Sequence, residues 1–90
     1  MNTVERLEQA LRVAKKLGYS IRHECLDGGV GGTCEIRGKK WMFVDLAISV
    51  SDQLDQVVDG LRFDPAIRSV SLPDELLALL AQPVSRRKPA

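Results

Sequence analysis

Apolar residues recur every three or four positions at the start of the chain, which is the spacing of one face of an α-helix. They are Val4, Leu7, Leu11, Ala14 and Leu17. Asn2 or Thr3 is suited to cap such a helix, and Gly18 supplies the left-handed residue that commonly ends one. The pattern therefore predicts a helix up to residue 17.

From residue 19 the apolar spacing falls to two, the period of a β-strand. Segments 19–25, 33–37 and 41–46 are predicted as strands, separated by a glycine-rich tip and by a turn at Gly38-Lys39. Consecutive strands joined by short turns predict an antiparallel meander. If both turns are symmetric, one face carries Ile21, His23, Cys25, Cys34, Ile36, Trp41 and Phe43. We expect the helices to cover this face.

Helical spacing returns in the C-terminal half. Ser49 with Asp52 predicts a capped second helix, with an apolar stripe that continues to Leu61. Residues 67–70 could form a short fourth strand, and Pro73 opens a leucine-rich third helix. Residues 83–90 are expected to be a flexible basic tail.

Together these elements predict an α+β fold with two layers, in the order α-β-β-β-α-(β)-α, and one domain over residues 1–82. The second sheet face would carry Met42, Val44 and Leu46 beside charged side chains. That mixture is too apolar for water, so the third helix or a second copy of the chain should cover it. These three residues are the predicted interaction surface.

Composition narrows the classes of function only a little. The chain has 90 residues, of which 44% are hydrophobic and 28% charged, which is ordinary for a globular domain. A net charge of +1 gives no global reason to expect nucleic acid or an anionic membrane as partner. Even with three basic residues in the tail, Arg86 to Lys88, we do not expect nucleic acid. No secretory signal or membrane-spanning run is apparent, so the cytoplasm is the expected location.

The glycine-rich tip is the first candidate site. Gly28, Gly29, Gly31 and Gly32 could present backbone amides to an anion or nucleotide, with Asp45 on the neighbouring strand. Phosphate-binding loops, however, place a helix or a Gly-Lys-Ser/Thr motif after their glycines, and neither follows here. A turn that needs positive φ is the commoner explanation. Asp45 could equally accept hydrogen bonds from the loop or cap the next turn.

His23, Cys25 and Cys34 form the second candidate site. In the predicted register these three would share one face and could bind zinc or iron, or act as a redox dithiol. Against this, the chain has one histidine and no Cys-x-x-Cys motif, and free cysteines are commonly core residues. No cofactor is predicted.

The order Gly31-Gly32-x-Cys34-x-x-x-Gly38, followed by an apolar strand that ends at Asp45, resembles small uncharacterised bacterial proteins with a Gly-Gly-x-Cys hairpin. The resemblance implies an architecture and no chemistry. No complete catalytic set is apparent, so the preferred hypothesis is a non-enzymatic interaction or assembly module that binds a protein or forms a homodimer. A metal or thiol-redox protein and an anion binder remain the alternatives.

Overall fold

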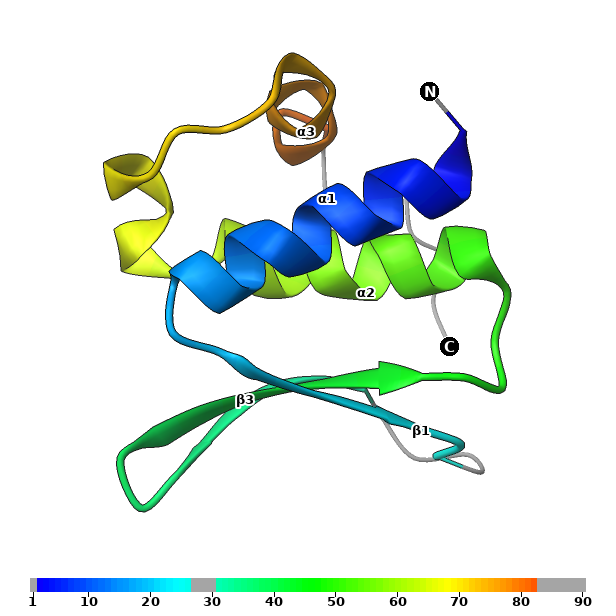
Figure 1. The fold of residues 1–90 in the computed structure, drawn as a ribbon, viewed down its shortest axis with the longest axis vertical. Helices are drawn as coiled ribbons and strands as arrows, with labels where there is room; N and C mark the ends of the chain where they lie inside the picture. The colour runs from blue at the N-terminus through cyan, green and yellow to red at the C-terminus, as the bar shows by residue number, and fades with distance from the viewer. Residues whose placement is uncertain (1, 27–30, 83–90) are drawn as a thin grey trace.

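The computed structural model describes residues 2–26 and 31–82 and shows an α+β fold, as predicted. Its elements are α1 (Thr3–Lys16), β1 (Ser20–Glu24), β2 (Gly32–Ile36), β3 (Lys39–Asp45), α2 (Val50–Arg62), the 3₁₀ helix η1 (Pro65–Ser69) and α3 (Asp74–Leu80). Figure 1 shows the sheet as one layer, with α1 and α2 side by side across one of its faces and α3 on the far side of this helix pair. None of the described helices is long and apolar enough to cross a membrane.

The strand order is β1-β3-β2, and β1 runs parallel to β3, whereas β2 is antiparallel to β3. The predicted antiparallel meander is therefore wrong, because β1 and β2 do not pair. β1 and β2 therefore lie on opposite sides of β3. At the end of β3, the Asp45 carboxylate accepts a hydrogen bond from the Leu26 backbone, just after β1.

The β2–β3 hairpin turns at Arg37 and Gly38, with φ angles of 52° and 79°. Two positive φ angles in a two-residue turn match the twist of paired strands. Cys34 therefore pairs with Trp41, not with Phe43 as predicted. The pairing is displaced by two residues, so Cys34, Trp41 and Phe43 still share a face.

That shared face, however, points away from the helices, so the predicted assignment of inner and outer faces is wrong for β2 and β3. It holds for β1, where Ile21 packs against the core. Met42 is 1% exposed and Val44 is fully buried, and both belong to the hydrophobic core that α1, α2 and Leu76 complete. Of the three residues predicted as an interaction surface, Met42 and Val44 are thus core residues, and Leu46 alone is exposed.

Close packing of α2 on the sheet accounts for this choice of face. Gly60 of α2 lies so near the sheet that a Cβ there would be 2.8 Å from Thr33 Cγ2 and 3.2 Å from Met42 Cε. The small side chain of Thr33 and the flexible thioether of Met42 fit this space. The rings of Trp41 and Phe43 require more room and lie on the opposite face.

The predicted caps of the first two helices are confirmed. Asn2 and Glu5 form a reciprocal capping box on α1, and the Ser49 hydroxyl accepts a hydrogen bond from the Asp52 backbone at the start of α2. Helix α1 ends before Gly18, whose φ is 97°.

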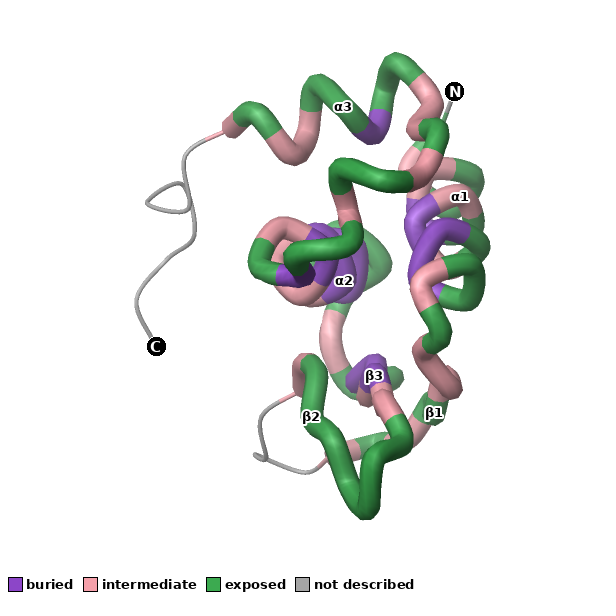
Figure 2. The backbone as a smooth tube through the Cα atoms, turned by 90° about the vertical axis from the view of Figure 1, so that its left-hand side faces the viewer, coloured by how far each residue is buried: buried purple, intermediate pink, exposed green. Residues whose placement is uncertain are grey.

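Two predictions for the C-terminal third need correction. The expected fourth strand at residues 67–70 is absent from the described chain, since η1 occupies most of this segment and Asp64 caps it. Helix α3 packs on α1 and α2 rather than over the sheet. Figure 2 shows α3 and the sheet on opposite sides of α2. The predicted tail, residues 83–90, lies outside the described residues.

Candidate functional site: the outer sheet face

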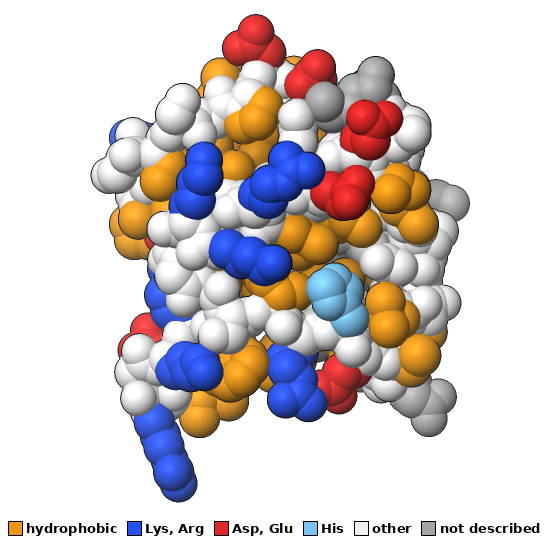
Figure 3. Space-filling view, in the orientation of Figure 1, with side chains coloured by type: hydrophobic (Ala, Val, Ile, Leu, Met, Phe, Trp, Pro, Cys, Tyr) orange, Lys and Arg blue, Asp and Glu red, His pale blue; other side chains and the backbone are white. Residues whose placement is uncertain are grey.

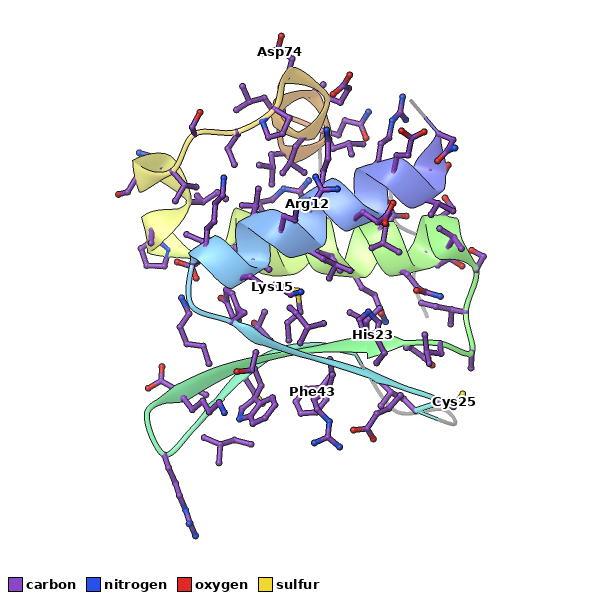
Figure 4. The ribbon with its side chains drawn as sticks, viewed as in Figure 1. Arg12, Lys15, His23, Cys25, Phe43 and Asp74 are labelled. Carbon is purple, nitrogen blue, oxygen red and sulfur yellow. The ribbon has the colours of Figure 1, made fainter. Side chains whose placement is uncertain are left out.

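No described helix covers the side of the sheet that faces away from α1 and α2. We call this surface the outer sheet face and define it by Arg22 on β1, Cys34 and Ile36 on β2, and Lys39, Trp41 and Phe43 on β3. Figure 4 shows the Phe43 side chain pointing away from the helices, whereas His23 lies on the helix side of the sheet.

Two aromatic rings occupy the centre of this face. Trp41 and Phe43 lie two residues apart on β3, the central strand, so both side chains project from the same side. Their ring centroids are 6.2 Å apart and their planes differ by 25°, which is a stacked arrangement. Both residues are half-buried. Because they are anchored on a paired strand, the rings form a preorganised apolar platform.

Cationic side chains flank the platform. Lys39 Nζ lies 4.6 Å from the centroid of the Trp41 ring, and Arg22 Cζ lies 6.0 Å from it, both within cation–π range. The carboxylate of Glu24 forms a 2.6 Å ion pair with Arg22. Both partners of this pair are solvent-exposed, so the interaction is weak and easily exchanged. Arg37 adds a further cation in the adjoining turn.

The structure does not bring His23, Cys25 and Cys34 together. β3 lies between the strand that carries His23 and the strand that carries Cys34, and these two residues project from opposite faces. Cys25 and Cys34 are both free and exposed. Within residues 2–26 and 31–82, no three His, Cys, Asp or Glu side chains are grouped as metal ligands.

The glycine tip is described only in part, since Gly28 and Gly29 lie outside the described residues. Gly31 lies against the Gln56 side chain, and a Cβ there would approach the Gln56 amide to 2.7 Å. Gly32 has a φ of 132°, which favours glycine.

Asp45 is 5% exposed, and one of its carboxylate oxygens accepts hydrogen bonds from the backbones of Leu26 and Ala47. This carboxylate would repel an anion bound beside it. The geometry thus matches the turn-capping alternative for Asp45.

A buried polar cluster was not found by sequence reasoning. Asp64 Oδ2 accepts hydrogen bonds of 2.7 Å from both Tyr19 Oη and Lys40 Nζ, and its other oxygen accepts one from the Ala66 backbone. Lys40 Nζ also donates to the Leu17 carbonyl. The one sequence signal was Asp64 before a proline, a common helix cap.

The environment shifts two pKa values in this cluster. Burial, with the hydrogen bond to Asp64 and its charge, raises the pKa of Tyr19 to about 12. Burial alone would raise the pKa of Asp64, but the hydrogen bonds from Lys40, Tyr19 and the Ala66 backbone, with the Lys40 charge, hold it below its usual value. The side chains of Tyr19, Lys40 and Asp64 each hydrogen-bond within the fold, so the cluster connects the end of α1 to β3 and to the start of η1.

An apolar hollow of about 460 Å³ lies between η1 and α3. Its lining residues are Ile67, Arg68, Val70, Leu72, Leu77 and Leu80. Arg68 is its one charged lining residue, so the hollow lacks the convergent polar groups of a typical ligand site. The outer sheet face, with aromatic and charged groups side by side, is the stronger candidate.

Comparisons with protein-family models, with curated proteins and with solved structures find no match to this chain.

Proposed function

We propose that this protein is a non-enzymatic interaction module that binds its partner through the outer sheet face. The observation that carries the proposal is the stacked pair of Trp41 and Phe43 on a sheet face that no described helix covers. Aromatic and arginine side chains contribute most of the energy in many macromolecular interfaces, and here they are already held in place.

The other polar groups support a binding role rather than catalysis. The carboxylates of Asp45 and Asp64 are both buried and hydrogen-bonded within the fold. General acid–base catalysis would instead need such groups to reach a substrate. The free thiols of Cys25 and Cys34 fit a reducing compartment, so the proposal places the protein in the cytoplasm.

The test compares two variants of the full chain. Trp41→Thr/Phe43→Thr removes the platform and keeps β-forming residues. Phe63→Thr is the matched control, because Phe63 is 73% exposed and follows α2, which lies on the opposite side of the sheet from the platform. Each protein is crosslinked in a lysate, the captured proteins and nucleic acids are quantified, and self-association is measured by light scattering. Circular dichroism verifies that each variant is folded.

We expect the double variant to lose a partner, or self-association, that both the wild type and Phe63→Thr retain. The proposal is overturned if the wild type is monomeric and captures nothing, or if the folded double variant captures the same molecules in the same amounts.

A further inference from the structure

We infer that the outer sheet face binds single-stranded nucleic acid, with bases stacked on Trp41 and Phe43 and phosphates paired with the surrounding cations. This inference rests on the proposed function and names the class of partner. Single-stranded RNA and DNA share the chemistry in question, namely flat bases joined by phosphodiesters.

The aromatic geometry is the first support. Proteins that bind single strands place aromatic side chains on exposed sheet surfaces, where each ring stacks on a base of any sequence. Trp41 and Phe43 are nearly parallel and lie at alternate positions of the central strand. Lys39 lies over the Trp41 ring, but an exposed cation–π contact is weaker than base stacking. Its flexible chain can therefore leave the ring and pair with a phosphate.

Charge complementarity is the second support. Lys39 and Arg37 form no salt bridge within the described residues, and the exposed pair of Arg22 with Glu24 exchanges at little cost. The carboxylate of Asp45, at the end of β3 beside Glu24, is buried in backbone hydrogen bonds. Glu35 on β2 alternates with Cys34 and Ile36, so its side chain projects from the helix side of the sheet. The face is therefore locally basic although the whole chain has a net charge of only +1.

The same charges disfavour a second copy of the chain as the occupant. Packing two outer sheet faces together would bring their cations into one interface, where like charges destabilise the contact. Figure 3 shows that basic side chains also lie over the helices, mixed with acidic ones, so positive charge is not confined to this face. The outer sheet face differs because its cations adjoin the aromatic pair.

Arg37 is the third support. Its φ of 52° is a conformation that side chains other than glycine, asparagine and aspartate rarely adopt. Turns of this type strongly favour Asn-Gly or Asp-Gly. An arginine therefore costs stability here, and it adds a positive charge at the end of the aromatic face. Strain of this kind is typical of functional positions.

The experiment uses the full chain and the fluorescence of Trp41, the single tryptophan of the protein. The probes are uridine and thymidine oligonucleotides of about twelve nucleotides, a length that typical single-strand sites accommodate. A duplex of similar length and poly-glutamate serve as anionic controls. We expect saturable quenching by at least one single strand, weaker binding of both controls, and an affinity that falls as salt rises.

Variants separate stacking from charge. Phe43→Leu keeps an apolar side chain and should weaken binding about tenfold, since one stacking ring is lost. Lys39→Gln should lower the slope of log affinity against log salt by about 0.7, the value for one phosphate contact on a single strand. Lys15→Gln, on α1 and so on the opposite side of the sheet from the platform, is the matched control and should leave the slope unchanged (Figure 4). Thermal melting verifies that each variant is folded.

Absence of saturable binding to either single strand, or equal affinity in folded Phe43→Leu, overturns the inference. So does preferential binding of poly-glutamate, which would identify an acidic protein as the partner. If the Trp41- and Phe43-dependent partner in the lysate is a protein and no oligonucleotide binds, the nucleic-acid inference fails while the proposed function stands. If no captured partner depends on Trp41 and Phe43 and no oligonucleotide binds, the nucleic-acid inference and the proposed function both fail.

Discussion

Replacing Gly60 by alanine tests the packing that decides which sheet face is inside. In an open helical position this substitution stabilises a protein by roughly 0.8–1.0 kcal/mol, because alanine loses less backbone entropy on folding. Here the new methyl group would lie 2.8 Å from Thr33 Cγ2 and 3.2 Å from Met42 Cε. Overpacking a well-filled core costs roughly 1–3 kcal/mol, so the net expectation is a loss of about 1 kcal/mol.

Urea unfolding followed by circular dichroism measures this difference. With a slope of about 1 kcal/mol per M for a small domain, the midpoint should fall by about 1 M. Thr33→Ser removes the methyl group that clashes, so Gly60→Ala combined with Thr33→Ser should be more stable than the sum of the two single changes by about 1 kcal/mol. Stabilisation by Gly60→Ala alone, or strict additivity, would show that α2 does not contact this face of the sheet.

Four further outcomes concern the buried cluster and the hairpin turn. Lys40→Met leaves the 4% exposed carboxylate of Asp64 without its cation; because Lys40 is partly exposed, we expect a loss of about 2 kcal/mol in urea unfolding, partly recovered by adding Asp64→Asn. Since the pKa of Asp64 is lowered, its contribution to stability is present above about pH 4 and lost as the pH falls, and Asp64→Asn should remove this acid limb. The pKa of Tyr19 is raised to about 12, so its contribution to stability is full below about pH 10 and is lost as the pH rises toward 12. Tyr19→Phe should remove this loss of stability at high pH in the same pH series. Arg37→Asn should raise the melting temperature, by relieving about 1 kcal/mol of left-handed strain, while it weakens oligonucleotide binding; an unchanged melting temperature would contradict the strain argument.

The helices could be predicted because their signals are local. Asn2, Glu5 and Ser49 bond to backbone groups within one turn, so the caps can be read directly from residue spacing. Gly18 likewise ends α1 through its own backbone conformation. No distant residue is needed to explain these boundaries.

The sheet topology could not be predicted in the same way. Neighbouring strands in sequence usually pair, and the glycine-rich segment favours a hairpin between the first two strands. The observed parallel pairing of β1 with β3 depends on distant contacts, such as the hydrogen bond from Leu26 to Asp45. Nothing local in either segment specifies that contact.

The inner face of β3 was also ambiguous, because both faces of this strand are apolar. Trp41 and Phe43 alternate with Met42 and Val44, so periodicity separates the two sets without showing which one is buried. Gly60 determines which set is buried, because it allows α2 to pack closely on Thr33 and Met42. This close packing exists only in the folded chain. Periodicity with symmetric turns therefore places the aromatic pair in the core, and the net charge of +1 gives no sign of a nucleic-acid partner.

The most direct test of the binding surface uses the two exposed thiols, Cys34 and Cys25. Cys34 lies opposite Trp41 on the outer sheet face, whereas Cys25 follows β1 at the other end of the sheet (Figure 4). The rate at which a bulky maleimide modifies each thiol is measured by peptide mass spectrometry, with and without saturating single-stranded oligonucleotide. Binding at the outer sheet face predicts that Cys34 reacts several-fold more slowly while Cys25 reacts at its original rate; unchanged modification of Cys34, or protection of Cys25 alone, would contradict it.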